Sequence, residues 1–285
     1  MQSSRSCGGL TGTALVAASR LGARCAYAGT LGDDALSKYC MRLFRREGVS
    51  LHGLRNYSGI SPIYSTIVVG EVDATRNIFY NLTCFEAAPQ DWPSERVLDG
   101  LRVLFVDNFH IAAQTRLATL ARELRIPVVA DFEDCEAEGF DRLMQLCDHL
   151  ILSSNFASRI TAYFDPQDAV RALWREDRVM VAVTCGANGC YFAMRDANAS
   201  RPNVRHMPAF TVEAVDTTGC GDVFHGAYAT GLVQGQDIPG CLRFASAAAA
   251  LKATRPGGPT GAPTIAELKQ FLEEHDGKGI IDTGD

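Results

Sequence analysis

The sequence predicts an α/β fold built around a mainly parallel sheet. Short apolar runs alternate with amphipathic stretches along most of the 285 residues, which is the pattern of successive βαβ units. We expect buried strands at Arg24–Ala28, Arg102–Asp107, Pro127–Asp131, His149–Leu152 and Val179–Thr184. We expect helices at Leu10–Leu21, Asp34–Glu47, Ala112–Leu124, Phe140–Leu146 and Asp168–Arg175. Since each strand is followed by a helix, the helices should cover the sheet.

One region interrupts this alternation. Ile63–Val69 and Asn77–Asn81 are rich in β-forming residues, and the turn-like stretch Gly70–Arg76 joins them. Two such runs indicate an antiparallel hairpin at the sheet edge or in a flap. We therefore expect a β-rich lid around residues 56–82.

The last third of the chain has a different pattern. A strand-like run from Ala209 leads into a glycine-rich turn, and helical patterns follow at Val223–Val233, Ile238–Ala253 and Ile265–Glu274. The Asp/Gly-rich end after residue 275 is typical of a flexible tail. No repeat or low-complexity linker divides the sequence, so a single domain over residues 1–285 is expected.

Composition excludes several classes of partner. The 27 Lys+Arg and 33 Asp+Glu residues give a net charge of −6 with no basic block, which disfavours nucleic acid and anionic membranes as partners. No apolar window is long enough to span a bilayer, and the first ten residues lack the apolar core of a signal peptide. The ten cysteines are dispersed without a CxxC pair, which favours free thiols in a cytoplasmic protein.

The segment that suggests chemistry is the turn before the helix at Val223–Val233. Gly219, Cys220 and Gly221 precede Asp222 there. Glycines let backbone N–H groups approach a ligand, and a helix N-terminus adds unpaired donors and a partial positive charge. The turn therefore predicts an anion hole suited to phosphate.

Asp222 has two interpretations at that position. A carboxylate in the first turn of a helix stabilises it by about 0.3–1 kcal/mol, and a cap alone is the commoner explanation. A carboxylate beside a phosphate also suits a general base that takes a proton from an attacking hydroxyl. The turn alone does not decide between them.

The run DTTGCGDVFHGAYATGL, residues 216–232, resembles the C-terminal signature of the ribokinase-like, or PfkB-type, carbohydrate kinases. Gly8 and Gly9, followed by the helix expected at Leu10–Leu21, resemble that family's N-terminal glycine motif. The Gly-Asp-Asp turn at 32–34 resembles the motif that comes next in the family. Thr184–Gly189 and Thr254–Gly258 resemble its two nucleotide-side loops, and all of these motifs occur in family order. Within the family, the motifs look most similar to the sulfofructose kinase-like branch.

The resemblance implies a ribokinase-like three-layer sandwich and transfer of a phosphoryl group from ATP to a hydroxyl of a small sugar, with Mg²⁺ on the phosphates. Asp222 is then the general base, and the backbone of Gly219, Cys220 and Gly221 forms the anion hole. The residues implied on the nucleotide side are Thr184, Gly186, Ala187, Gly189, Thr254, Gly257 and Gly258.

On the sugar side, the resemblance places Gly8, Gly9, Thr13 and Asp33. Asn108 and His110 follow the strand at 102–107, and the ends of parallel strands are where ligand crevices form. Thr13 stands where the family usually has Asn, and no arginine follows that strand, which disfavours a sulfonated substrate. A neutral ketose or related polyol is expected instead.

Two further features follow from the resemblance. The family often keeps a monovalent cation such as K⁺ behind the anion hole, and the matching ligands are Asp216 and Thr218, with carbonyls near Lys252, Arg255 and Gly257. Lid strands in the family often pair across a dimer. A homodimer through the predicted hairpin is therefore expected.

The sequence also departs from the family pattern. Family members begin with a central strand and lid strands, whereas only seven residues precede Gly8, so the first strand and part of the lid are expected to be missing. The family's Asn-x-x-Glu element reads Asn155-Phe156-Ala157-Ser158, without its carboxylate. Either the reading frame is truncated or a normal sugar site is lost. The alternative function is a weakened or inactive homologue that binds sugar or nucleotide.

Overall fold

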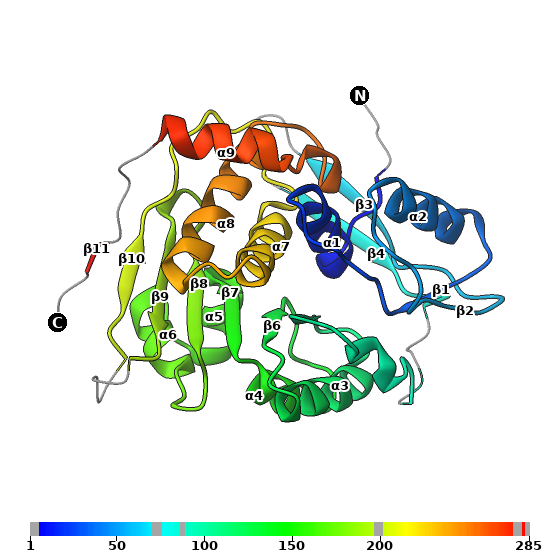
Figure 1. The fold of residues 1–285 in the computed structure, drawn as a ribbon. Coiled ribbons are helices and arrows are strands. Elements are labelled where there is room, and N and C mark those ends of the chain that lie inside the picture. The colour runs from blue at the N-terminus through cyan, green and yellow to red at the C-terminus, as the bar shows by residue number, and fades with distance from the viewer. Residues whose placement is uncertain are drawn as a thin grey trace.

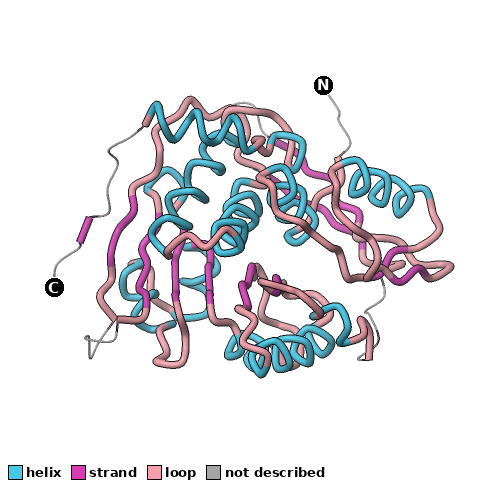
Figure 2. Tube along the Cα trace, in the orientation of Figure 1, coloured by secondary structure: helices cyan, strands magenta, loops and turns pink. Residues whose placement is uncertain are grey.

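A central sheet lies between two layers of helices, as expected for a three-layer sandwich. The computed structural model describes residues 6–69, 76–85, 89, 91–196, 202–275 and 281–282. The strand order is β11-β10-β9-β8-β7-β6-β5. Figure 1 shows the layers, and Figure 2 separates the strands, in magenta, from the helices on either side. The sheet strands are β5 (Leu104–Val106), β6 (Val128–Asp131), β7 (His149–Ser153), β8 (Met180–Thr184), β9 (Cys190–Met194), β10 (Arg205–Met207) and β11 (Ile281–Asp282).

Half of the sheet is parallel and half is antiparallel. The strands from β5 to β8 pair in parallel, as their predicted βαβ connections require. The strands from β8 to β11 pair antiparallel, and this edge was not predicted as such. At the other end, β5 pairs only with β6 in the part of the chain that the structure describes.

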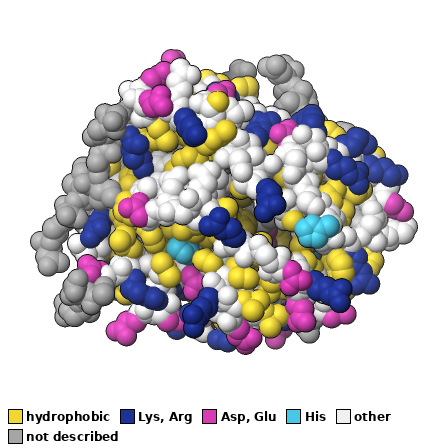
Figure 3. Space-filling model, viewed as in Figure 1, with side chains coloured by type: hydrophobic (Ala, Val, Ile, Leu, Met, Phe, Trp, Pro, Cys, Tyr) yellow, Lys and Arg dark blue, Asp and Glu magenta, His cyan; other side chains and the backbone are white. Residues whose placement is uncertain are grey.

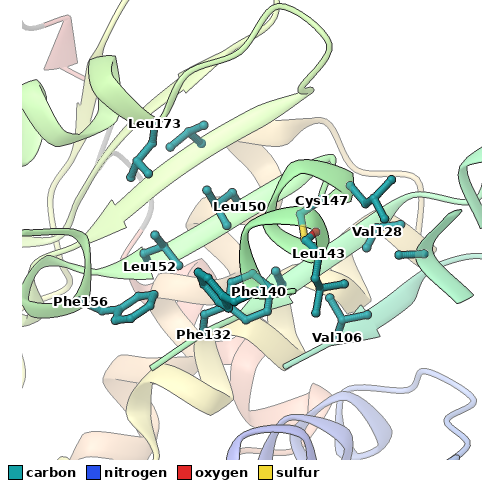
Figure 4. Close-up of a cluster of buried hydrophobic side chains, with 14 of the residues drawn as sticks. Val106, Val128, Phe132, Phe140, Leu143, Cys147, Leu150, Leu152, Phe156 and Leu173 are labelled. Atoms are coloured by element: carbon teal, nitrogen blue, oxygen red, sulfur yellow. The ribbon is translucent and has the colours of Figure 1, made fainter. Parts of the chain in front are cut away.

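Successive side chains of the strands enter two different cores. Val129 and Ile151 pack under the helices α1 (Leu10–Arg20), α7 (Cys220–Val233), α8 (Ile238–Ala253) and α9 (Ile265–Glu274). Val128 and Leu150 point the other way, into the cluster of Figure 4. That cluster is covered by α3 (Ile111–Glu123), α4 (Phe140–Leu146), α5 (Ser154–Thr161) and α6 (Pro166–Leu173). A sheet covered on both faces explains why its strands read as continuous apolar runs.

Helices α1 and α7 approach each other closely at a glycine. A Cβ atom built on Gly226 would lie 2.2 Å from the carbonyl oxygen of Ala14, so only glycine fits at this crossing. This contact holds α1, which Gly8 and Gly9 precede, against α7 on the same side of the sheet (Figure 1).

The predicted antiparallel hairpin is confirmed. Strands β3 (Tyr64–Val69) and β4 (Arg76–Asn81) pair antiparallel in a separate two-stranded sheet. The predicted turn between them lies outside the described residues, apart from Arg76. Next to the hairpin, β1 (Thr30–Leu31) pairs in parallel with β2 (Arg55–Asn56), and α2 spans Ala35–Arg46.

Two predicted strands were wrong. Arg24–Ala28 makes only one isolated bridge, from Ala26 to Ser50, because this stretch runs beside residues 50–56 rather than in the central sheet. The strand expected from Ala209 lies earlier, at β10, and ends before Pro208, which has no N–H group to continue the ladder. Helix α5 and strand β9 were not predicted.

The predicted flexible tail after residue 275 lies mostly outside the described residues. Within it, Ile281 and Asp282 form β11 and pair with His206 and Arg205 of β10. The other predicted helices and strands are found within two residues of their expected bounds, except that α7 begins at Cys220, three residues before the expected Val223.

Candidate active site

The predicted anion hole is a tight turn at the start of α7. Gly219 caps the helix with a φ of 78°, a left-handed conformation that favours glycine. The amide of Val223 donates to the Gly219 carbonyl at 2.9 Å, so the helix is regular from its first turn. A Cβ atom on Gly221 would meet nothing within 4 Å. The turn therefore has open space at Gly221, beside the first-turn amides.

Asp222 lies in that first turn and is half-buried. Burial raises the pKa of Asp222 well above its ordinary value, and the carboxylates of Asp131 and Glu133 raise it further. His225 and a hydrogen bond from the Thr13 side chain lower it, without outweighing burial. Asp222 is therefore a stronger base than an exposed aspartate, which suits proton abstraction near neutral pH.

Asp131 ends strand β6 and lies near enough to Asp222 to act on its pKa. The residue is 5% exposed, and its Oδ2 atom lies 3.3 Å from Nδ1 of His225. Burial raises the pKa of Asp131 well above its ordinary value, as do Glu133 and Asp107. Asp131 is buried, whereas Glu133 in the loop that follows is exposed.

His225 connects α7 to the sheet. Its Nδ1 atom lies 2.8 Å from the carbonyl oxygen of Gly221, and its Nε2 atom lies 3.0 Å from that of Ile151 on β7. Burial lowers the pKa of His225, against the effect of these two carbonyls. The ring fixes the first turn of α7 over the strand ends, which agrees with the structural role that is common for a helical histidine.

Asp107 organises the end of β5. Its Oδ2 atom accepts a hydrogen bond of 2.5 Å from the Thr11 hydroxyl on α1. Its Oδ1 atom accepts from the amide of Phe109 at 2.9 Å and from the Gln114 side chain at 2.8 Å. Asp107 therefore joins α1, β5 and α3 at one edge of the candidate site.

The predicted sugar-side residues fall into two groups. Two of them belong to the network around the strand ends. The Thr13 side chain is hydrogen-bonded to Asp222, and the Asn108 side chain accepts a hydrogen bond of 3.0 Å from the amide of Glu133. Gly9 caps α1, whose residue Thr13 reaches Asp222, and Gly8 precedes it. Neither glycine would bring a Cβ atom within 4 Å of any other group.

Asp33 and His110 instead contact the lid side. Asp33 accepts a hydrogen bond of 2.9 Å from the Ser58 hydroxyl, and Asp34 accepts one of 2.9 Å from Ser61. Asp34 also caps α2 by accepting the amide of Ser37. The ring of His110 stacks on Phe85, just after the hairpin, with centroids 5.2 Å apart.

The predicted nucleotide turn joins β8 and β9. Thr184 ends β8, and the amide of Cys185 donates to the Gly189 carbonyl at 2.7 Å, which closes the turn. Gly186 and Gly189 both have positive φ. A groove of about 770 Å³ lies beside this turn, lined by Ala187 and Asn188 and by residues of α5, β9 and the segment after β10. The size of the groove suits a nucleotide base.

The second nucleotide-side loop packs against the anion hole. Thr254 ends α8, and Gly257 follows with a φ of 86°. The Cα atom of Gly258 lies 3.2 Å from where a Cβ atom on Gly219 would be. The loop and the anion hole are thus in direct contact, although they are far apart in the sequence.

The expected cation ligands hold this contact together. Oδ1 of Asp216 accepts the Thr218 amide and Oδ2 accepts the Gly257 amide, each at 2.8 Å. Burial acts to raise the pKa of Asp216, but these hydrogen bonds outweigh it and lower the pKa. Both carboxylate oxygens therefore already have protein donors.

Sequence reasoning did not select Asp107, Asp131 or Glu133 as site residues. The available signal was that Asp107 directly follows β5 and Asp131 ends β6, the adjacent parallel strand, since ligand crevices form at such strand ends. No group of three or more His, Cys, Asp or Glu side chains in the described ranges is arranged to hold a metal ion.

Comparison with known proteins decides the family. The model of the pfkB family carbohydrate kinases matches residues 1–265 of this chain. The chain belongs to this family. It is therefore a carbohydrate kinase, a phosphotransferase with an alcohol group as acceptor.

Individual relatives of this carbohydrate kinase are ribokinases and fructokinases. Ribokinase of Haemophilus influenzae is 26% identical over 279 residues, covering 93% of this chain and 87% of the relative. Fructokinase-1 of Zea mays is 26% identical over 293 residues, covering 94% and 88%. These similarities do not confirm the sulfofructose kinase-like branch.

Solved structures confirm the ribokinase-like fold of the kinase. A putative ribokinase from Agrobacterium tumefaciens superposes with a TM-score of 0.84 at 27% identity, over 94% of this chain and 86% of that one. A putative ribokinase II from E. coli in complex with ATP and Mg²⁺ has a TM-score of 0.80 at 21% identity, over 94% and 89%.

The surface and helices of the kinase give two further observations. On the face drawn in Figure 3, acidic and basic side chains lie interspersed. Within the described residues, no helix has the length and apolar character needed to cross a membrane.

Proposed function

We propose that the protein transfers the γ-phosphoryl group of ATP to a hydroxyl of a small neutral sugar, with Asp222 as the general base. The observation that carries this proposal is the position of Asp222. Its carboxylate lies in the first turn of α7, beside the open space at Gly221, and is bonded by Thr13. A base and an anion-binding turn are thus adjacent, as phosphoryl transfer requires.

In the proposed step, the sugar hydroxyl oxygen forms a bond to the γ-phosphorus as its proton passes to Asp222. The bond from that phosphorus to the oxygen bridging it to the β-phosphate breaks, and ADP leaves. Backbone amides around Gly219, Cys220 and Gly221 stabilise negative charge on the transferred oxygens. The protein therefore contributes position, a base and hydrogen-bond donors.

The proposed nucleotide position follows from the contact between two loops. The residues Thr184, Gly186, Ala187 and Gly189 form one side, next to the groove of about 770 Å³. Thr254, Gly257 and Gly258 form the other side, and Gly258 lies against Gly219 of the anion hole. When bound with ATP, Mg²⁺ would neutralise phosphate charge. The E. coli structural relative that binds ATP and Mg²⁺ supports this choice of cofactors.

We propose that the sugar lies between the N-terminal turn of α1 and the ends of β5 and β6. Gly8, Gly9 and Thr13 approach it from α1, Asn108 and His110 from the end of β5, and Asp33 from the lid side. Asp107, Asp131 and Asp222 make this region rich in carboxyl groups. Such a region disfavours phosphorylated, sulfonated or carboxylated sugars and agrees with a neutral ketose or polyol.

The lid and the cellular location complete the proposal. Phe79 and Tyr80 of β4 are 64% and 66% exposed, and as neighbours on a strand they face opposite sides of the hairpin. Exposed aromatics on both faces favour a homodimer through the hairpins. All ten cysteines lie in the described ranges and none forms a disulfide, which agrees with a cytoplasmic protein.

A substrate panel tests the proposed function. The purified protein is incubated with ATP, Mg²⁺ and each of a set of pentoses, hexoses, ketoses and polyols, and ADP release and the ³¹P spectrum of the product are recorded. We expect sugar-dependent ADP release with one neutral sugar and a new phosphate ester. If ATP raises the melting temperature but no sugar is phosphorylated, the protein is instead the weakened nucleotide-binding homologue.

A further inference from the structure

A lysine ammonium group occupies the place where the family resemblance puts a monovalent cation. Lys252 lies in the last turn of α8 and is 0% exposed. Its Nζ atom donates to the carbonyl oxygen of Asp216 at 2.7 Å and to that of Arg255 at 3.1 Å. The Oδ2 atom of Asp216 is 4.0 Å away. These groups belong to the same residues that were expected to hold K⁺.

The residues present therefore do not fit a bound K⁺ ion. The carbonyl oxygens of Asp216 and Arg255, two of the residues expected at the cation site, accept hydrogen bonds from Lys252. Both carboxylate oxygens of Asp216 accept backbone amides. A cation at the same oxygens would meet the like charge of the ammonium group and would have to displace it.

We propose that Lys252 permanently takes the place of the monovalent cation, so that the enzyme works without potassium. Lys252 is then a positioning residue, because it acts through the anion hole and does not touch the substrates. Its ammonium group resembles K⁺ in charge and in its preference for carbonyl oxygens. Unlike a free ion, it is attached to α8 and cannot dissociate.

The position on α8 stabilises a buried positive charge. The carbonyl groups at the end of a helix carry a partial negative charge that favours a cation in the last turn. The Asp216 carboxylate adds a full negative charge at 4.0 Å. Since a buried ion is costly unless it is paired and hydrogen-bonded, these oxygens account for the ammonium group inside the protein.

A short series of contacts connects Lys252 to the anion hole. Lys252 joins the segment before α7, at Asp216, to the loop after α8, at Arg255. The amide of Gly257 closes the same loop onto Asp216, and Gly258 packs against Gly219. Loss of the ammonium group would leave the Asp216 carboxylate without its counter-charge and loosen this loop. The anion hole would then be less well positioned.

The first experiment uses the wild-type protein. Its melting temperature and its sugar kinase activity are measured in KCl and in tetramethylammonium chloride, at equal ionic strength and with MgATP. The proposal predicts the same melting temperature in both salts and activities within about twofold. Saturable activation by K⁺ of fivefold or more, or a rise in melting temperature specific to K⁺, would overturn it.

The second experiment removes the ammonium group. Lys252→Met keeps the apolar stem, and Lys252→Ala leaves space for an ion. Both should lower kcat by about tenfold or more, the scale of a lost hydrogen bond to a charged group. In Lys252→Ala, K⁺ or methylammonium should restore at least part of the activity and raise the melting temperature. Lys269→Met, which removes an exposed ammonium from α9, is the matched control and should behave as wild type.

The proposal rests on the proposed function only for its activity readout, and the melting temperatures separate the two. Suppose that no sugar is phosphorylated, that K⁺ leaves the melting temperature of the wild type unchanged and that K⁺ raises the melting temperature of Lys252→Ala. The proposed function then fails and the role of Lys252 stands. If the wild type is an active kinase that K⁺ activates, the proposed function stands and the role of Lys252 fails. Should Lys252→Ala not fold, the wild-type comparison and Lys252→Met still decide the question. A Lys252→Met variant with wild-type kcat in tetramethylammonium would also contradict the proposal.

Discussion

The side chain of Thr13, on the first helix of the chain, is hydrogen-bonded to the carboxylate of Asp222 at the start of α7. Thr13 is 1% exposed, so the bond is shielded from water. The sequence predicted Thr13 as a sugar ligand in place of the family's Asn, and the structure adds a contact with the proposed base. This hydrogen bond stabilises the ionised form of Asp222 and lowers its pKa against the effect of burial.

Replacing Thr13 tests that contact. Thr13→Val keeps the shape but removes the hydroxyl, so the pKa of Asp222 should rise further and kcat at pH 7 should fall by about tenfold. Thr13→Ser keeps a hydroxyl and should stay within about threefold of wild type. Steady-state kinetics of both variants measure the difference. A valine variant as active as the serine variant would show that the hydrogen bond has no catalytic effect.

The pH dependence of activity follows from the raised pKa of Asp222. A general base works in its ionised form, so activity is present above its pKa and is lost as the pH falls through it. Because the pKa is raised, the acid limb of kcat/KM should lie above the ordinary carboxylate range near about pH 4. Asp131→Asn removes one of the repelling carboxylates and should move this limb to lower pH. Asp134→Asn, in the same loop but paired with Arg159, is the control and should not move it.

Replacing either of two glycines of α7 with alanine should have different effects, on stability at Gly226 and on activity at Gly221. Gly226→Ala would place Cβ 2.2 Å from the Ala14 carbonyl oxygen and should lower Tm by about 4 °C or more. Gly221→Ala meets no protein atom within 4 Å and should leave Tm unchanged or slightly higher. Its methyl group enters the proposed phosphoryl space, so kcat/KM should fall by about 100-fold. Full activity of a stable Gly221→Ala variant would argue against the anion hole.

The exposed aromatics of the lid predict a dimer. Light scattering after size exclusion should give twice the 30.8 kDa mass of the chain. The double variant Phe79→Ser/Tyr80→Ser should elute as a monomer, because it removes the apolar surface of the hairpin. Phe164→Ser, at an aromatic residue that is 91% exposed outside the lid, should leave the dimer intact. A monomeric wild type at micromolar concentration would contradict the proposal.

Much of the fold could be predicted from the sequence because its central elements have clear periodicity. The parallel strands from β5 to β8 are apolar runs buried on both faces, and α1, α7 and α8 have well-marked helical patterns. The stretch at Arg24–Ala28 has the composition of a strand, but its partner is the irregular segment 50–56 and not the sheet. Composition alone does not determine which segment a strand-like stretch pairs with.

The candidate site was predictable where a motif is continuous in sequence and less so where it is assembled in space. The anion hole, both nucleotide-side loops and Asp222 are local patterns. Asp107 and Asp131 lie at the ends of β5 and β6, which are adjacent in the sheet but separate in the sequence. The side chain of Lys252 reaches the carbonyl oxygen of Asp216, which is also distant in the sequence. The family resemblance implied K⁺ near Lys252, and the proposal that the Lys252 ammonium group takes its place needed the structure, because a pattern of ligands does not reveal where a neighbouring side chain points.

The most direct test of the account is phosphoryl transfer by Asp222→Asn. Radiolabelled γ-phosphate transfer from ATP to the sugar identified in the panel is measured for both proteins, together with the ATP dissociation constant. The account predicts that transfer falls by about 10²–10⁴-fold while ATP binds within about threefold of wild type, because the amide keeps the shape but cannot take the proton. An Asp222→Asn variant that transfers phosphate at the wild-type rate would contradict the central claim.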